Sequence, residues 1–448
     1  MEASRSILTE LDQYLKKEMI SISQFAKLTD LHSGTLSNIL NGHRPIAMQQ
    51  LDRITTAMGL VEGYYYELYI DNYIIEGAPD WRRIGPLIHR CAEMGKLDSI
   101  RRVVEHVLDK LAYSQLFFDT AEELYSEGYK EAASILYECV AEGERYQHSE
   151  RLAVCQYRIF TIALGDNQIQ NLFAATRFEP YVERLDEMEQ LDALKDLANT
   201  YRSLHCWDKV DEFAEKMGRK AHIQYELVHK PVRKWKGTGK KLTRPLFMYI
   251  AYSNLLRANV CHERGDYDQA LEYMYSSSDL SWVKEQGEEI DYWKNLFLEW
   301  TRANIMMTKL LSGDFSVLEQ YVAYLDEQKE ELITGLLYIM KAANKYKKNV
   351  DGVLEHFQTD IEEIRKDVVL KRYSRRLVLD RQASLMYELG QYYYLQGETA
   401  KGSEYLNQCS KKYKRINPEK HRMLGRVTEI LRSNDNGKSS GKHPLPKT

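Results

Sequence analysis

Small polar residues gather between positions 33 and 38, on a short predicted helix. The apolar residues Leu36 and Ile39 lie three apart, so they share one face. A short helix that carries small donors and acceptors on its outer face can enter the major groove of DNA. The residues that face outward are Ser33, Gly34, Thr35, Ser37 and Asn38.

A second helix and a turn must hold this surface in place. Ala26 lies where two helices must approach closely, Asp30 opens the turn, and Leu31 follows as an apolar plug. Asp tolerates positive φ better than most residues, and we expect Ser33 to cap the following helix. The residues expected to form one small core beneath the motif are Phe25, Leu28, Leu36, Ile39, Leu40, Leu51 and Ile54.

The stretch from Ser21 to Met58 resembles the repressor-like helix-turn-helix family. The residues that carry the resemblance are Gln24, Ala26, Leu36, Ser37, Ile39, Leu40, Asn41, Gly42 and Arg44. It implies that Gln24 and Arg44, with His43 beside it, lie near phosphates, and that the outward face of residues 33–38 lies near base edges. The turn departs from the family at Asp30, where glycine is usual, and at His32, where a serine or threonine cap is usual. The alternative is a helix-turn-helix kept only for protein contacts.

Three further helices are expected around this motif. The first runs from Ser4 to Lys17 and another from Ala47 to Gly59. A tyrosine-rich stretch, Val61 to Ile75, is interpreted as a linker helix that closes the first domain, and its aromatic stripe as packing. The Gly77-Ala78-Pro79 tripeptide marks the domain boundary.

The composition limits the classes of protein to consider. The 448 residues have ample material for large cores. A net charge of −4 gives no global basic field, and residues 1–59 are balanced in charge. One copy therefore offers few phosphate contacts, which favours a homodimer on an inverted-repeat DNA site.

No sequence feature points to an enzyme, a cofactor, a metal or a membrane. Catalytic and metal-binding motifs are missing, and no run approaches the ~20 apolar residues of a membrane helix. The amino terminus does not read as a signal peptide. The six cysteines are scattered without a CxxC pair, which suggests buried thiols in a reducing compartment. The lack of a signal peptide and of a membrane-length apolar run predicts a cytoplasmic protein. Nine prolines and few strand-like alternations predict the all-α class.

From Asp80 onward one pattern repeats: an amphipathic helix, a short turn with Gly, then a second helix. The sharpest copy covers residues 255–280 and turns at Gly265-Asp266-Tyr267, with Ala270 and Tyr273 packing back. A second copy covers residues 389–409. Weaker copies turn near positions 95, 128, 206 and 313, and less regular pairs are expected at 149–188 and 331–366.

These copies resemble degenerate tetratricopeptide repeats. Each pair buries its apolar faces only against its neighbours, so we expect a right-handed superhelix with a concave groove. The sequence thus predicts a helix-turn-helix domain at 1–60, a linker helix at 61–78, a peptide-binding and dimerising repeat domain at 79–432 and a disordered tail at 433–448. The basic segment 229–245 is either a solvated loop or an auxiliary phosphate-contacting arm.

In these repeats, positions 2, 5, 9 and 12 of the first helix of a pair face the groove. Side-chain amides there suit an extended peptide, because one amide can donate to a backbone carbonyl and accept from a backbone N–H. Ordinary polar groove residues are the alternative. The candidate residues are Asn199, Asn259 and Gln391, then Lys195, Arg202, Tyr252 and His262, and, one position off, Asn304.

The pairing of a repressor-type helix-turn-helix with a long repeat array resembles the peptide-responsive regulators of Gram-positive bacteria and their phages, the RRNPP group with its PlcR, arbitrium-receptor and AloR-like members. The resemblance implies a transcription regulator switched by a short signalling peptide. One alternative is a regulator or scaffold whose groove holds a protein partner. Another, a Rap-like phosphatase-stimulating protein, is disfavoured because Rap proteins begin with a helical bundle instead of a DNA-reading unit.

Overall fold

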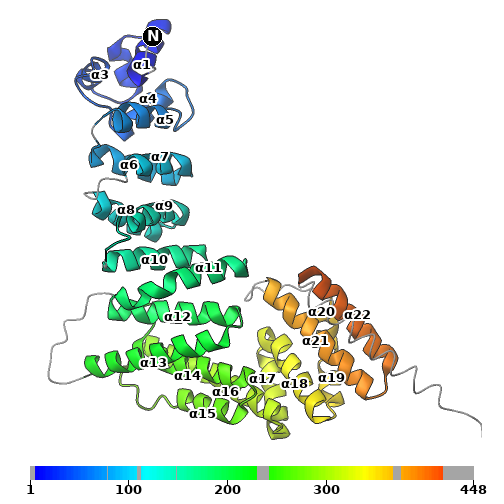
Figure 1. The fold of residues 1–448 in the computed structure, drawn as a ribbon. Helices are drawn as coiled ribbons and strands as arrows, with labels where there is room; N and C mark the ends of the chain where they lie inside the picture. Colours follow the sequence, from blue (N-terminus) through cyan, green and yellow to red (C-terminus); the bar gives the residue numbers. More distant parts are fainter. Residues whose placement is uncertain are drawn as a thin grey trace, which may run out of the picture. The chain divides into compact units, whose positions relative to one another are not determined.

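The computed structural model describes residues 6–77, 79–107, 113–147, 149–229, 242–366 and 375–416, and every regular element in these ranges is a helix (Figure 1). The all-α class is therefore confirmed. The chain divides into two compact units, Met1–Thr200 and Tyr201–Thr448. Most of the basic segment 229–245, and the whole predicted tail 433–448, lie outside the described residues. The domain bounds expected from the sequence stay predictions.

The first unit begins with the four helices of the predicted motif: α1 (Ile7–Lys17), α2 (Ile22–Leu28), α3 (Ser33–Leu40) and α4 (Met48–Ala57). Phe25, Leu36, Ile39, Leu51 and Ile54 are fully buried, as predicted.

Leu28 is a correction to the predicted core, because its side chain is 63% exposed. Helix α2 turns Phe25, Ala26 and Thr29 inward, and Leu28 falls outside that face. Leu40 is only partly buried.

The linker also differs from its prediction. Residues 62–65 form turns, with Gly63 at φ +74°, so the helix does not begin at Val61. It begins at α5 (Tyr66–Ile70) and continues as a π-helical turn, η1 (Asp71–Ile75). The expected packing role is confirmed for Tyr65, Tyr66 and Tyr69, which are buried, and for Tyr73, which is partly buried, but not for Tyr64, which is exposed.

Helix pairs follow the linker through the rest of the first unit. They comprise α6 (Trp81–Glu93), α7 (Leu97–Val107), α8 (Ser114–Glu127), α9 (Lys130–Gly143), α10 (Glu150–Ala163), α11 (Gln168–Phe178), η3 (Glu179–Arg184) and α12 (Glu187–Ser203). Gly95 and Gly128 turn the chain with positive φ, as the repeat pattern predicts. One hydrophobic cluster runs without a break from Ile7 to Cys155. The motif helices and the first helix pairs thus share a core.

The second unit continues the same pattern. Its elements are α13 (Trp207–Val228), α14 (Leu246–Glu263), α15 (Tyr267–Ser278), α16 (Glu288–Ser312), η4 (Phe315–Val317), α17 (Leu318–Glu327), η5 (Lys329–Glu331), α18 (Leu332–Tyr346), α19 (Asp351–His356), α20 (Gln358–Arg365), α21 (Arg375–Leu395) and α22 (Thr399–Ile416). The turns at Gly265 and Gly397 have positive φ, and Ala270 is fully buried, so both strong repeat copies are confirmed as helix pairs.

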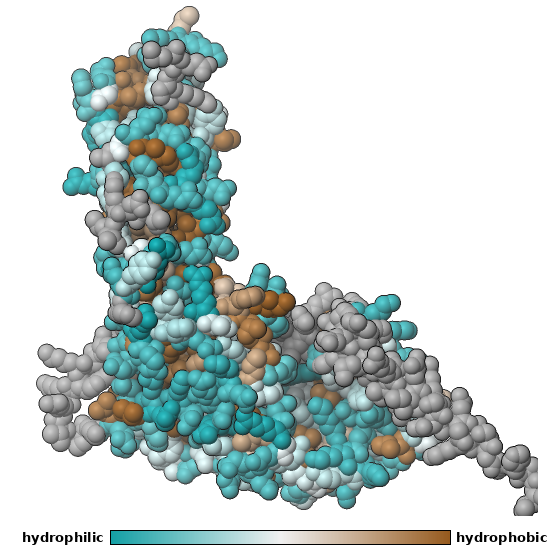
Figure 2. Space-filling model, viewed as in Figure 1, coloured by the Kyte–Doolittle hydropathy of each residue, from teal (hydrophilic) through white to brown (hydrophobic). Residues whose placement is uncertain are grey.

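Hydrophilic side chains cover most of the face drawn in Figure 2, and hydrophobic ones form separate patches on it. Among the described residues, no helix is long and apolar enough to span a membrane. All six cysteines are free thiols, and Cys91, Cys139, Cys155 and Cys409 are buried, as predicted, whereas Cys206 and Cys261 are only partly buried.

Candidate nucleic-acid interface

Helix α2 is fixed at its start by a reciprocal cap. The Ser21 hydroxyl accepts the backbone N–H of Gln24 at 3.3 Å, and the Gln24 side-chain oxygen accepts the Ser21 backbone N–H at 2.9 Å. This capping box satisfies two of the donors that a helix start leaves unpaired. Gln24 is exposed, and its amide nitrogen is the part of the side chain left for a phosphate.

The turn between α2 and α3 is held by specific contacts. Asp30 adopts φ +50°, which confirms that this residue replaces the usual glycine. Arg53 of α4 donates to the Asp30 carbonyl at 2.9 Å and to its carboxylate at 3.2 Å. The expected cap by Ser33 is wrong: His32 caps α3, because its Nδ1 accepts the Gly34 N–H at 3.2 Å. The Ser33 hydroxyl is thereby left to the outer surface.

Helix α3 presents most of the predicted residues to solvent. Ser33, Gly34 and Asn38 are exposed, whereas Thr35 and Ser37 are half-buried rather than fully outward. They lie on the flanks of the helix, next to its buried face. The Ser37 hydroxyl also accepts the Asn41 side-chain amide at 3.4 Å.

The exit from α3 carries the remaining candidates. Gly42 turns the chain at φ +70°, and the backbone N–H groups of His43 and Arg44 both donate to the Asn38 carbonyl, at 2.9 and 3.1 Å. Both side chains are exposed. The structure therefore brings the predicted DNA-binding residues together on α2, α3 and the exit loop.

The electrostatics of this surface are modest for one copy. Lys16 pairs with Asp12 at 2.6 Å, and Arg53 pairs with Asp30 at 3.2 Å, so these two cations are already partly neutralised. Arg44 lies exposed at the helix exit. One copy offers little positive charge to a duplex, whose affinity for proteins depends on phosphate contacts.

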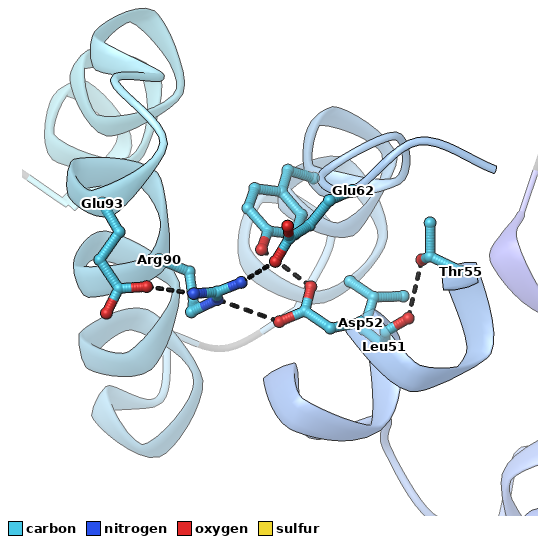
Figure 3. A network of polar contacts seen from close by, with 7 residues as sticks. Leu51, Asp52, Thr55, Glu62, Arg90 and Glu93 are labelled. Atoms are coloured by element: carbon cyan, nitrogen blue, oxygen red, sulfur yellow. Dashed lines mark hydrogen bonds and ion pairs between the residues drawn. The ribbon is translucent and has the colours of Figure 1, made fainter. Parts of the chain in front are cut away.

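A polar network joins α4 to the first helix pair of the array (Figure 3). Arg90 of α6 donates through Nε to Asp52 of α4 at 3.1 Å, and its terminal nitrogens contact Glu62 and Glu93. The Tyr66 hydroxyl donates to the other Asp52 oxygen at 2.8 Å. Burial, followed by this hydrogen bond, raises the pKa of Tyr66, so the phenol stays protonated. Sequence reasoning missed this network, since its members lie 28 and 38 residues apart.

A second network joins α7 to the linker. Arg102 contacts Glu67 and lies 2.7 Å from the Asp71 carboxylate, and the Ser99 hydroxyl donates to Glu67. Burial acts to raise the pKa of Glu67, but the hydrogen bonds from Ser99 and Arg102 outweigh it and lower that pKa. The Tyr69 hydroxyl donates to the Ile46 carbonyl at 2.9 Å, just beyond the exit from α3.

The predicted peptide-binding residues are spread along the array. Lys195, Asn199 and Arg202 lie on α12, and Tyr252, Asn259 and His262 lie on α14, while Asn304 is on α16 and Gln391 on α21.

Lys195, Asn304 and Gln391 are among the candidates whose side chains have partners within the chain. Lys195 lies 2.8 Å from Asp192 and 3.5 Å from Asp196, so its charge is neutralised. The Asn304 amide donates to the Trp300 carbonyl at 2.8 Å, and the Gln391 amide donates to the Tyr387 hydroxyl at 2.7 Å.

His262 has the most unusual environment of the set. Its side chain is 8% exposed, and its ring lies edge-on between Tyr267 and Tyr338, with centroids 5.7 and 5.6 Å away. Burial, with a smaller effect from Lys341, lowers its pKa to about 4, so the imidazole is neutral. Its Nε2 is buried and has no partner among the described residues.

A second buried group without a partner lies in the same unit. The Asn344 amide nitrogen donates to the Glu388 carboxylate at 2.8 Å, whereas its carbonyl oxygen is buried and unpaired among the described residues. Burial raises the pKa of Glu388, and the Asn344 hydrogen bond opposes that rise. Sequence reasoning missed Asn344, because the helix pair at 331–366 is less regular than the other copies.

Comparison with known proteins adds little about function. No family model matches the chain, and no curated protein matches it. One similar solved structure is that of aspartyl phosphate phosphatase F from Bacillus subtilis, at 10% identity and a TM-score of 0.38, covering 92% of this chain and 96% of that one. A likeness of this degree says nothing about activity or partners. Within the described residues, no group of three or more His, Cys, Asp or Glu side chains could hold a metal ion.

Proposed function

We propose that this protein is a non-enzymatic, cytoplasmic transcription regulator that binds duplex DNA through α3. The observation that carries the proposal is the α2–turn–α3 geometry, in which capped helices leave Ser33 and Asn38 exposed, Thr35 half-buried on the flank, and His43 and Arg44 exposed at the exit. Small side chains of this kind can form hydrogen bonds to base edges, while Arg44 supplies a phosphate contact.

We further propose that a short signalling peptide bound by the helical array controls this DNA binding. Supporting groups lie in the second unit, where His262 Nε2 and Asn344 Oδ1 are buried without partners. A buried polar atom without a partner costs about 1–3 kcal/mol, so a ligand that pairs it gains affinity. The half-buried Asn259 amide on α14 suits the main chain of an extended peptide.

A protein partner is the second candidate for the array. Stacked helix pairs present extended surfaces that suit a folded protein as well as a peptide. The two candidates differ in their genetic context. The gene of a peptide-controlled regulator is expected beside a short reading frame that encodes a secretion signal followed by a small mature peptide. Calorimetric titration of such peptides into the purified protein distinguishes the two candidates. An array that binds only a protein partner should give no heat of binding with the peptides.

Selection from a random pool of DNA duplexes tests the DNA-binding proposal. We expect the wild type to enrich one sequence family and the double variant Thr35→Ala, Asn38→Ala to enrich it much more weakly, since each lost bidentate base contact costs about 1–3 kcal/mol. Gln13→Ala, an exposed change on α1, is the matched control and should select the wild-type sequence. Identical selection by the double variant and the wild type would refute the proposed reading surface.

A further inference from the structure

The junction between the helix-turn-helix and the array is tightly packed. Gly63 sits in the turn that precedes α5, and a Cβ there would lie 2.5 Å from the Lys96 side chain and 3.1 Å from Met94. Tyr65, Tyr66 and Tyr69 are buried in the core that α1–α4 share with the first helix pairs. A flexible linker would instead be polar and exposed. The helix-turn-helix is therefore attached as a packed body.

Arg90 ties this body to α6. Its planar guanidinium presents several donors in a fixed fork, which suits simultaneous contact with more than one carboxylate. It contacts Asp52 on α4, Glu62 in the turn before α5 and Glu93 on its own helix. The Tyr66 hydroxyl donates to the second oxygen of Asp52, so one oxygen of this α4 carboxylate is held by the array and the other by the linker.

Arg102 ties the other end of the linker to α7. Its two terminal nitrogens contact Glu67 on α5 and Asp71 at the start of η1. Arg90 and Arg102 lie on the two helices of one pair, and together they contact four acidic residues of α4, the turn and the linker. Moving the helix-turn-helix against this pair would break several charge-assisted contacts at once.

We propose that Arg90 and Arg102 are positioning residues that fix the angle of α3 relative to the first helix pair, so that the array itself sets how far apart two recognition helices stand on DNA. This inference rests on the proposed function for its DNA consequence. A rigid attachment cannot adapt to altered half-site spacing, because each added base pair both shifts and rotates the second half-site. The expected result is a narrow spacing requirement.

Distance measurement between two spin labels tests the rigid attachment without DNA. The labels are placed at Lys17→Cys on α1 and Lys130→Cys on α9, both exposed, in full-length protein with the partly accessible Cys206 and Cys261 changed to Ser. We expect one narrow distance distribution, and a distribution at least about twice as wide in Arg90→Met, Arg102→Met. The matched control is Arg101→Met, an exposed arginine next to Arg102.

Glu62→Gln is the milder variant in case the double change unfolds the first unit, because Glu62 lies exposed in a turn. It removes one Arg90 contact and leaves the buried tyrosines in place. It should broaden the distribution by a smaller factor. Unchanged distributions in both the double variant and Glu62→Gln would overturn the inference.

The DNA consequence is tested on synthetic duplexes that carry two copies of the half-site selected by the wild type, at spacings varied one base pair at a time. Wild-type affinity should fall about tenfold one base pair from the optimum, and about threefold or less in Arg90→Met, Arg102→Met, because a looser attachment lets both recognition helices reach their half-sites. The inference would be overturned if wild-type affinity did not depend on the half-site spacing, or if it depended on the spacing equally in the wild type and the double variant. Failure of the wild type to select any sequence would refute the proposed function, while the label distances would still report on the attachment.

Discussion

Arg44 illustrates how one residue's surroundings define its expected role. It is exposed at the exit from α3, and its backbone N–H donates to the Asn38 carbonyl, so its position is fixed although its side chain is not. We expect Arg44→Ala to weaken binding to all duplexes by a similar factor and to reduce the salt slope by about 1. Titrations at several salt concentrations measure both quantities. An effect restricted to the selected sequence would instead make Arg44 a base-reading residue.

His262 gives a second residue-level prediction, on pH and stability. Its pKa is lowered from 6.5 to about 4 in the folded protein. As the pH falls, the unfolded chain therefore takes up a proton on His262 before the folded protein does. The contribution of this residue to the free energy of unfolding is complete above pH about 6.5 and is lost on acidification towards about 4. Within that pH window, the free energy of unfolding of the wild type should fall by about 1.4 kcal/mol per pH unit more than that of His262→Gln. Thermal melting from pH 7 to 4.5 measures the difference, and parallel curves would contradict it.

The helix elements were the most predictable level of this protein. Amphipathic periodicity and glycine turns suffice to locate helix pairs, because both are local properties of the chain. The errors have local causes too: Gly63 delays the linker helix, and the His32 imidazole replaces the expected Ser33 cap. Leu28 shows why hydrophobic periodicity is a weak guide on a short helix: a shift of one residue decides whether a side chain is buried or exposed.

The close contact of α21 with α22 yields a prediction at the element scale. A Cβ at Gly390 would lie 2.8 Å from Leu406 Cγ and 3.2 Å from the Gly402 carbonyl. Gly390→Ala should therefore destabilise the second unit by about 1–3 kcal/mol, as overpacking does. Gly352→Ala on α19 is the matched control, since a Cβ there meets nothing within 4 Å. Equal melting temperatures for the two variants would show that this helix pair tolerates a methyl group.

At the scale of the whole molecule, sequence reasoning could identify the parts but not how they are joined. The contact between Arg90 and Asp52 spans 38 residues, and nothing in the local pattern of either helix marks the partner. The candidate DNA surface was visible because its residues are contiguous in the chain. The groups around His262 were not, because Tyr338 and Lys341 come from another helix pair.

A homodimer is the whole-molecule prediction. One recognition helix in nearly neutral surroundings reads few base pairs, whereas a two-fold pair places two helices on an inverted repeat. Light scattering of the purified full-length protein at micromolar concentration should give the mass of two chains, with the carboxy-terminal helix pairs as the expected interface. A single-chain mass both with and without the selected duplex would contradict the prediction.

The affinity ratio between the selected duplex and a scrambled duplex of equal composition tests the central claim most directly. Fluorescence anisotropy at one near-physiological salt concentration measures both affinities. We predict that the wild type prefers the selected duplex by about a thousandfold or more, and that Thr35→Ala, Asn38→Ala loses at least about tenfold of this ratio while keeping its affinity for the scrambled duplex. Equal affinities of the wild type for the two duplexes, or an unchanged ratio in the double variant, would contradict it.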